Sequence, residues 1–366
     1  MSAQRQQGDR LLLRNLTIAC FVLTSVGVAQ AFTSPKGYLT TEGATDHNYM
    51  LFSKYEMYWQ AIDKTNIGAG TKVMREVGWR RDGTGAASTY AARTMTNWEM
   101  SIAKADYGLH NSVDISKNAL AGTLKQVVKP RTLNVVDVSA PPTTAPAPWT
   151  TVVKFDTPFI YDGLDALLWE VRYTANTMST NYSFDFTTGG NYAYSSSTAA
   201  KLGTACTSSG STSPISWTTQ WRNYGTGFSI YHAGISNLPK SAPAFLWIDF
   251  MDANLSAPIV CTTIHALPTI VLPLGVSDSL GSLAKAEFPL PYVASAVGAS
   301  LYGQVWGFDA GRASGLPMSF SDGAKWTIPS DPTSHDVVRN YRYKTTSTSS
   351  EIVSGPWTGG IITRFQ

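Results

Sequence analysis

Charged residues are scarce in this 366-residue chain, and their scarcity argues against some classes of partner. They make up 14% of the sequence, whereas a typical soluble domain has about a quarter. The 28 basic residues barely outnumber the 25 acidic ones. A nucleic-acid-binding protein needs a basic face to neutralise phosphates, so this composition predicts no nucleic-acid partner. Serine, threonine, glycine, alanine and aromatic residues are abundant instead, which suits β-sheets with hydroxylated outer faces.

The chain also lacks an apolar run long enough to span a bilayer. The longest, residues 16–29, has 14 residues, where a spanning helix needs about 20. It follows three arginines and one aspartate and ends in Ala29-Gln30-Ala31, the small-x-small pattern of signal-peptide cleavage. We therefore expect residues 1–31 to be removed after Ala31, with no transmembrane segment left. The protein should be secreted by the general secretory route, to the extracellular space or the cell surface.

Two other export signals are disfavoured. A lipid anchor on Cys20 would require the apolar run to end there, and it continues well beyond. Thr17 is also a poor match to the leucine usual three residues before such a cysteine. The arginines are not adjacent, which argues against twin-arginine export. Without the leader the chain keeps 25 basic and 24 acidic residues, a net charge of +1.

Cysteine is rare, and only Cys206 and Cys261 remain after cleavage. Two cysteines in an exported chain most simply pair with each other. Closing a loop of this length stabilises the fold by roughly 4 kcal/mol on the chain-entropy model. A metal pair is the alternative, but no second cysteine or histidine lies at ligand spacing from either residue.

Helical periodicity is missing, and the sequence predicts an all-β fold. Short segments rich in β-branched and aromatic residues alternate apolar with polar positions between turn residues. The predicted strands are 73–79, 97–105, 132–138, 150–156, 166–174, 226–234, 242–252, 262–275, 283–291, 299–309 and 316–328. Residues 55–62 fit either a helical turn or an edge strand. The proline-rich segment 139–149 fits a loop within one domain better than a linker, because strand patterns flank it closely.

A resemblance to a known family covers nearly all of the mature chain. The second half carries GTAC (203–206), APAFLWIDF, CTTIHALPTIVLPL, FPLPYVA (288–294), LYGQVWGFD and GLPMSFSDGAKWTI. The first half carries GYLTTEGATDHNY, YEMYWQ, VGWRRDG and FDTPFIYDGLDALLWEVRY. The pattern that closes this half in the similar proteins lies at the far end of this chain, at 337–365. These motifs are similar to those of an uncharacterised family of secreted two-domain β-sandwich proteins from bacteria such as planctomycetes and myxobacteria.

The resemblance implies fold and secretion, and it brings no established activity. It implies two jelly-roll-like β-sandwich domains, with the second inserted into the first. The first domain would comprise residues 32–200 and 333–366, and the second, with the disulfide, residues 201–332. Segment 359–365 should then pair with strands from 37–190 and not with strands from 203–329.

Motifs for enzymatic chemistry are absent, so we expect no enzyme and no cofactor. The five histidines show no metal-ligand spacing, and the chain has neither Gly-x-Ser-x-Gly nor a phosphate-binding loop. Acidic residues do cluster in 156–170. Asp162 and Asp165 bound a turn there, and their oxygens are weak candidates for a structural calcium site. Carboxylate pairs also serve glycan hydrolysis.

Candidate contact residues remain. Arg80 and Arg81 precede an Asp-Gly turn, so they suit a solvated hairpin end or contact with an anionic polysaccharide. Most of the eleven tryptophans lie within strand patterns and suit the core. The tryptophans nearest to predicted loops, which are the candidates for stacking on sugar or on a partner, are Trp149, Trp217, Trp221 and Trp357.

Three functions are compatible with these observations. The first is a non-enzymatic extracellular structural protein, a matrix, surface or filament subunit that assembles with itself. Edge strands or the segment FTSPKGYLTT (32–41) would pair with a neighbouring subunit. The second is a carbohydrate-binding or adhesion module. The third is a secreted glycan hydrolase, which would need a cleft with two converging carboxylates.

Overall fold

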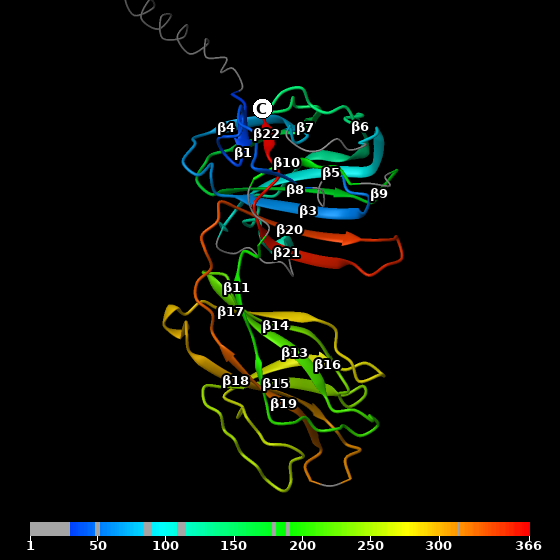
Figure 1. The fold of residues 1–366 in the computed structure, drawn as a ribbon, viewed down its shortest axis with the longest axis vertical. Helices are drawn as coiled ribbons and strands as arrows, with labels where there is room; N and C mark the ends of the chain where they lie inside the picture. Colours follow the sequence, from blue (N-terminus) through cyan, green and yellow to red (C-terminus); the bar gives the residue numbers. More distant parts are fainter. Residues whose placement is uncertain are drawn as a thin grey trace, which may run out of the picture.

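The chain folds into two β-sheet lobes, as seen in a computed structural model (Figure 1). The structure describes residues 30–47, 52–83, 90–107, 115–177, 181–187, 191–313 and 315–366. The leader predicted for residues 1–31 therefore lies almost entirely outside the described residues, as does His110. The described part contains antiparallel strands and two short 3-10 turns, Ile115–Lys117 and Ala294–Ala296, so the all-β prediction is confirmed. None of its helices has the length and hydropathy to cross a membrane.

The first lobe is built from both ends of the described chain. Its strands are β1 (Phe32–Ser34), β2 (Thr45–His47), β3 (Glu56–Asp63), β4 (Lys72–Trp79), β5 (Arg93–Ala105), β6 (Lys125–Val135), β7 (Thr151–Tyr161), β8 (Ala166–Tyr173), β9 (Ala175–Asn176), β10 (Phe184–Phe186), β20 (Val337–Lys344), β21 (Ile352–Thr358) and β22 (Thr363–Phe365). One sheet has the order β21-β20-β3-β8-β5-β6, with β9 beside β5; another has the order β1-β22-β4-β7; β10 pairs with β2. Buried side chains from these sheets form a large core, which includes Trp59, Trp79, Trp98 and Trp169, and a smaller cluster around Ile62 and Leu168.

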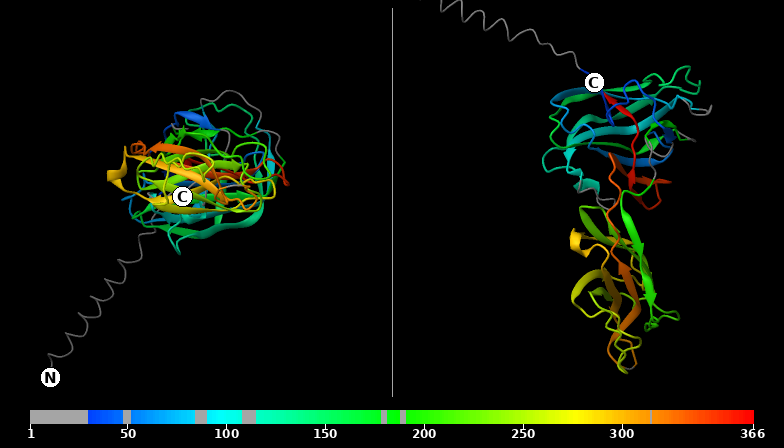
Figure 2. Two further views of the ribbon diagram at one scale, coloured as in Figure 1. Left: turned by 90° about the horizontal axis from the view of Figure 1, so that it is seen from below. Right: turned by 60° about the vertical axis from the view of Figure 1, so that its left-hand side comes forward.

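The second lobe is built from the intervening strands. These are β11 (Ser195–Thr198), β12 (Ala200–Leu202), β13 (Ser216–Asn223), β14 (Gly227–Ser236), β15 (Pro243–Asp249), β16 (Ile270–Val276), β17 (Ala286–Pro291), β18 (Ser300–Phe308) and β19 (Met318–Thr327). They form two sheets, β11-β13-β14-β17 and β12-β19-β18-β15-β16, around a separate core. Figure 2 shows this lobe below the first, joined to it near β11 and β20.

The C-terminal strands belong to the first lobe. β22 pairs with β4 and β1, and β20 pairs with β3 along its whole length. This is the pairing predicted for segment 359–365. The second lobe's strands begin at Ser195, a few residues before the predicted boundary, because the segment 191–216, which is rich in serine, threonine and alanine, supplies β11 and β12. That the second lobe is an autonomous inserted domain stays a prediction.

Two local ambiguities of the sequence are resolved. Segment 55–62 forms β3, which lies between β20 and β8 inside a sheet, so the helical-turn and edge-strand interpretations are both wrong. The sequence of β3 does not alternate between apolar and polar residues along its whole length, because five of its last six residues are buried. Segment 139–149 contains no strand and joins β6 to β7, whose residues Val128 and Val153 share one core. It is therefore a loop within the lobe.

Proline interrupts the longer edge strands of the four larger sheets. These prolines are Pro130 in β6, Pro158 in β7, Pro273 in β16, Pro289 and Pro291 in β17, and Pro356 in β21. Proline lacks the N–H that a further strand would need, so it protects an edge against strand addition. The other edge strands, β1, β11 and β12, have three or four residues each.

Candidate functional site

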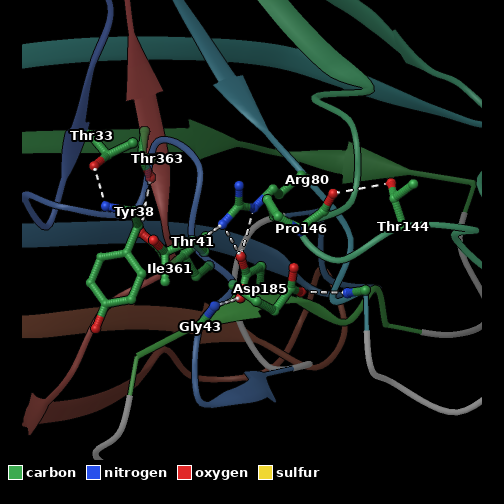
Figure 3. Close-up of polar contacts among 12 residues, drawn as sticks. Thr33, Tyr38, Thr41, Gly43, Arg80, Thr144, Pro146, Asp185, Ile361 and Thr363 are labelled. Carbon is green, nitrogen blue, oxygen red and sulfur yellow. Dashed lines mark hydrogen bonds and ion pairs between the residues drawn. The ribbon is translucent and has the colours of Figure 1, made fainter.

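Arg80 and Arg81 are structural residues, which corrects their prediction as partner contacts. Arg80 is buried and donates from Nε to Asp185 Oδ2 at 2.6 Å and from Nη2 to the carbonyl of Thr41 (Figure 3). Arg81 is also buried and donates to three carbonyls of the loop after β6, among them that of Val138 at 2.8 Å. Neither guanidinium faces solvent. Each holds a loop against the sandwich by donating hydrogen bonds to the backbone carbonyls of that loop.

The acidic turn offers no open cation site. Lys104 Nζ lies 2.8 Å from a carboxylate oxygen of Asp162 and 2.8 Å from one of Asp165. Its ammonium group occupies the place between the two carboxylates that a calcium ion would take, and hydrogen bonds from Lys104 lower the pKa of Asp162. Within the described ranges, no group of three or more histidine, cysteine, aspartate or glutamate side chains is arranged to hold a metal.

The four candidate tryptophans have different environments. Trp217 and Trp221 lie in β13, not in loops, and both are buried in the core of the second lobe, so they cannot contact a sugar. Trp149 is half-buried between the guanidinium groups of Arg80 and Arg364. Trp357 is half-buried in β21 and stacks on Tyr192, with 4.2 Å between the ring centroids.

Trp357 lies beside a pocket where the two lobes meet, because it stacks on Tyr192, which lines that pocket. The pocket has a volume of about 260 Å³. Its walls come from three parts of the chain: the passage into β11, the outer face of the sheet containing β13, β14 and β17, and the β21 strand of the first lobe. The lining residues are Tyr192, Tyr194, Arg222, Tyr231, Lys285, Ala286, Glu287, Val353, Ser354 and Gly355.

One wall of the pocket is aromatic. Tyr192 is 48% exposed, and its ring lies 4.2 Å from that of Trp357 and 4.8 Å from that of Tyr194. An isolated bridge between Tyr192 and Trp357 fixes the two backbones against each other. The rings of Tyr194 and Tyr231 both contact the guanidinium of Arg222, at 4.6 and 3.9 Å.

The polar part of the lining contains the charged residues Arg222, Lys285 and Glu287. Arg222 Nη1 lies 3.1 Å from Glu287 Oε2, and both side chains are about nine-tenths buried or more. Tyr224 and Ser229 donate their hydroxyl hydrogens to the other oxygen of Glu287. Burial lowers the pKa of Arg222, but the charge of Glu287 and the neighbouring tyrosines outweigh it, so that the net shift is upward and Arg222 stays charged.

A second hollow, over the seven-stranded sheet, is lined by the carboxylates of Glu56, Glu99 and Glu351. Glu99 accepts a hydrogen bond from Gln126 at 2.6 Å, and Glu351 lies 3.5 Å from Arg342. Glu170 lies beneath it with its side chain 4% exposed, and accepts hydrogen bonds from Tyr58 at 2.6 Å and Gln60 at 3.0 Å. Around it Lys344 pairs with Glu56 at 3.2 Å. These groups form a cross-strand network that stabilises the sheet.

Trp357 is the only predicted contact residue beside the pocket. Tyr192 and Tyr194 lie in a segment rich in serine and threonine, and Tyr231 lies in an ordinary strand pattern, so these three tyrosines do not stand out in the sequence. The Tyr-x-Tyr spacing at 192–194 was the available signal, since two alternating aromatic residues directly precede β11. Arg222 and Glu287 are 65 residues apart, and no local pattern links them.

The fold and pocket define an all-β protein with two sandwich lobes, one disulfide and a pocket between the lobes. Comparison with known proteins finds no matching family model, no matching curated protein and no matching solved structure. The resemblance to secreted bacterial proteins accordingly stays an expectation.

Proposed function

We propose that this chain is a secreted, non-enzymatic carbohydrate-binding protein whose ligand occupies the pocket between the lobes. The observation that carries the proposal is the exposed Tyr192, which stacks on Trp357 and lines a small pocket together with the polar residues Lys285 and Ser354. A sugar ring has an apolar face of C–H groups and a rim of hydroxyls. Exposed aromatic rings suit the first, and fixed donors and acceptors suit the second.

The extracellular setting is part of the proposal. A disulfide persists in oxidising compartments, and the bond between Cys206 and Cys261, whose Cα atoms are 5.5 Å apart, accords with the predicted signal peptide. Glycans are abundant outside cells, and a weakly charged surface binds them without attracting nucleic acid.

Replacing Tyr192 by alanine tests the function. We expect binding on a glycan array for the mature protein, and about fivefold weaker binding of the same glycan by Tyr192→Ala, because an aromatic contact contributes about 1 kcal/mol beyond simple burial. Calorimetry with the glycan found on the array gives the affinities. Tyr302→Ala, which removes a half-buried tyrosine from the other sheet of the second lobe, should bind like the wild type. Equal binding by Tyr192→Ala, or no binding at all, would contradict the proposal.

Self-assembly into an extracellular structure is the second candidate function, favoured by exposed apolar side chains in the segment between β15 and β16 of the second lobe. These side chains are Phe250, Met251, Leu255, Ile259 and Leu267. Surfaces of this kind mark contact sites. Strand addition is disfavoured by the edge prolines, and β1 already pairs with β22 of its own chain. Assembly would therefore use side-chain packing.

Light scattering at increasing protein concentration tests this candidate. We expect dimers or larger species for the wild type and a monomer for Phe250→Ser/Ile259→Ser, because the polar side chains remove apolar area from the contact. Tyr192→Ala should associate like the wild type. A wild-type protein that stays monomeric at the highest attainable concentration would rule out self-assembly.

A further inference from the structure

The pocket opens onto the outer face of the sheet β11-β13-β14-β17, and we infer that the ligand is a neutral, extended β-1,4-linked glycan that continues across this face. The inference rests on the proposed carbohydrate-binding function and deepens it. Its basis is a row of side chains that leads out of the pocket from strand to strand.

Cross-strand pairing aligns this row. Glu287 of β17 pairs with Tyr231 of β14, Tyr231 pairs with Gln220 of β13, and Gln220 pairs with Thr198 of β11. Directly paired residues point to the same face of a sheet. This is the outer face, because the alternate residues Trp221 and Ile230 lie in the core. The row crosses three gaps between strands, a length of about 14 Å.

The pocket by itself is small for an oligosaccharide. Its volume of about 260 Å³ lies below the range of roughly 300–1,000 Å³ typical of pockets that enclose drug-sized ligands. A sugar chain held at Tyr192 must therefore leave the pocket. Toward the first lobe, the pocket is bounded by Val353, Ser354 and Gly355 of β21. Toward the second lobe, Tyr231 continues the lining directly to Gln220.

The chemistry of the row suits a neutral chain. Glu287 is its one charged residue, and its carboxylate is buried and paired with Arg222, so the row presents no net charge. Lys285, which lines the pocket outside the row, is exposed and can donate to a sugar hydroxyl. Gln220 and Thr198 offer an amide and a hydroxyl that match sugar hydroxyls as donors and acceptors, and Tyr231 offers a ring. In β-1,4-linked glucose every ring substituent is equatorial, so each unit presents flat C–H faces to aromatic rings and hydroxyls at its edge.

Cellobiose and cellohexaose, compared by calorimetry, test the inference. We expect cellohexaose to bind the mature protein about tenfold more tightly than cellobiose, because the longer chain adds hydrogen bonds on the row. In Thr198→Ala/Gln220→Ala this advantage should disappear while cellobiose binds as before. Tyr302→Ala, on the other sheet, should keep the full advantage.

The outcomes separate this inference from the function on which it rests. If cellobiose and cellohexaose bind equally tightly, or if Thr198→Ala/Gln220→Ala keeps the advantage, the path across the sheet is wrong while the pocket stands. If neither binds but another glycan binds through Tyr192, the β-1,4 assignment is wrong. If no glycan binds through Tyr192, the proposed function itself fails.

Discussion

Replacing Arg80 by methionine should destabilise the protein by about 3–5 kcal/mol at pH 7.5. Arg80 and Asp185 have fully buried side chains and form an ion pair at 2.6 Å, with Gly43 N donating to the second carboxylate oxygen at 2.8 Å. Methionine fills a similar volume but leaves the carboxylate buried without its countercharge, and breaking a buried pair in this way costs several kcal/mol. Urea unfolding gives the free energies.

The same substitution should change how stability depends on pH. In the wild type, burial raises the pKa of Asp185 to about 6, although Arg80 opposes the shift. Without Arg80 the pKa rises further. A folded-state pKa above the unfolded one favours the folded protein at low pH, and this contribution is lost as pH rises through the folded pKa. Arg80→Met should therefore recover part of its lost stability between pH 7.5 and 5.

Two results would contradict this account of Arg80. One is a loss below 1 kcal/mol, and the other is a loss that does not depend on pH. The matched control is Arg80→Met/Asp185→Leu, in which no charge remains buried. It should be clearly more stable than Arg80→Met at pH 7.5, since replacing both partners of a buried pair by apolar residues is often neutral.

Replacing both cysteines by serine should destabilise the second lobe by about 4 kcal/mol. The bond between Cys206 and Cys261 closes a loop with a sequence separation of 55 residues, and the entropy that this closure removes from the unfolded chain corresponds to that energy. Cys206 also packs with Ile264 and Phe320 beside Trp247 and Trp306. The loop before β16 should therefore lose its fixed place over the five-stranded sheet.

Urea unfolding of the mature Cys206→Ser/Cys261→Ser variant measures this effect. Reduced wild-type protein should unfold like the variant, which serves as the control for the serine side chains. Cys261→Ser alone should lose as much as the double variant, because one cysteine cannot form the bond. A double variant within 1 kcal/mol of the oxidised wild type would show that the cross-link contributes little to stability.

The sequence was sufficient where a property depends on neighbouring residues. Alternating apolar positions and turn residues mark β4, β8, β18 and β19 within two residues of their observed bounds, because side chains of a strand point alternately to its two faces. They did not mark β13, and they placed the start of β16 too early. Segment 55–62 was ambiguous for the same reason: β3 is buried on both faces over most of its length, so its alternation disappears. The disulfide followed from composition, since two cysteines leave one pairing.

The candidate sites were harder, because burial and partners depend on residues far away in the chain. Arg80 and Arg81 look like a solvated turn until Asp185, 105 residues later, and the loop at 138–140 cover them. Asp162 and Asp165 resemble a calcium turn until Lys104 of a neighbouring strand lies between them. In each case a countercharge that is close in space is remote in sequence.

By itself, the sequence determined that the chain is all-β, nearly neutral and able to form one disulfide, because these properties follow from composition and local periodicity. Only the tertiary structure decided which tryptophans are buried, and that Tyr192, Arg222, Glu287 and Ser354 surround one pocket. They come from four separate segments. Because the C-terminal strands pair with the first lobe, β21 at the edge of that lobe lies against the β11-β13-β14-β17 sheet of the second lobe.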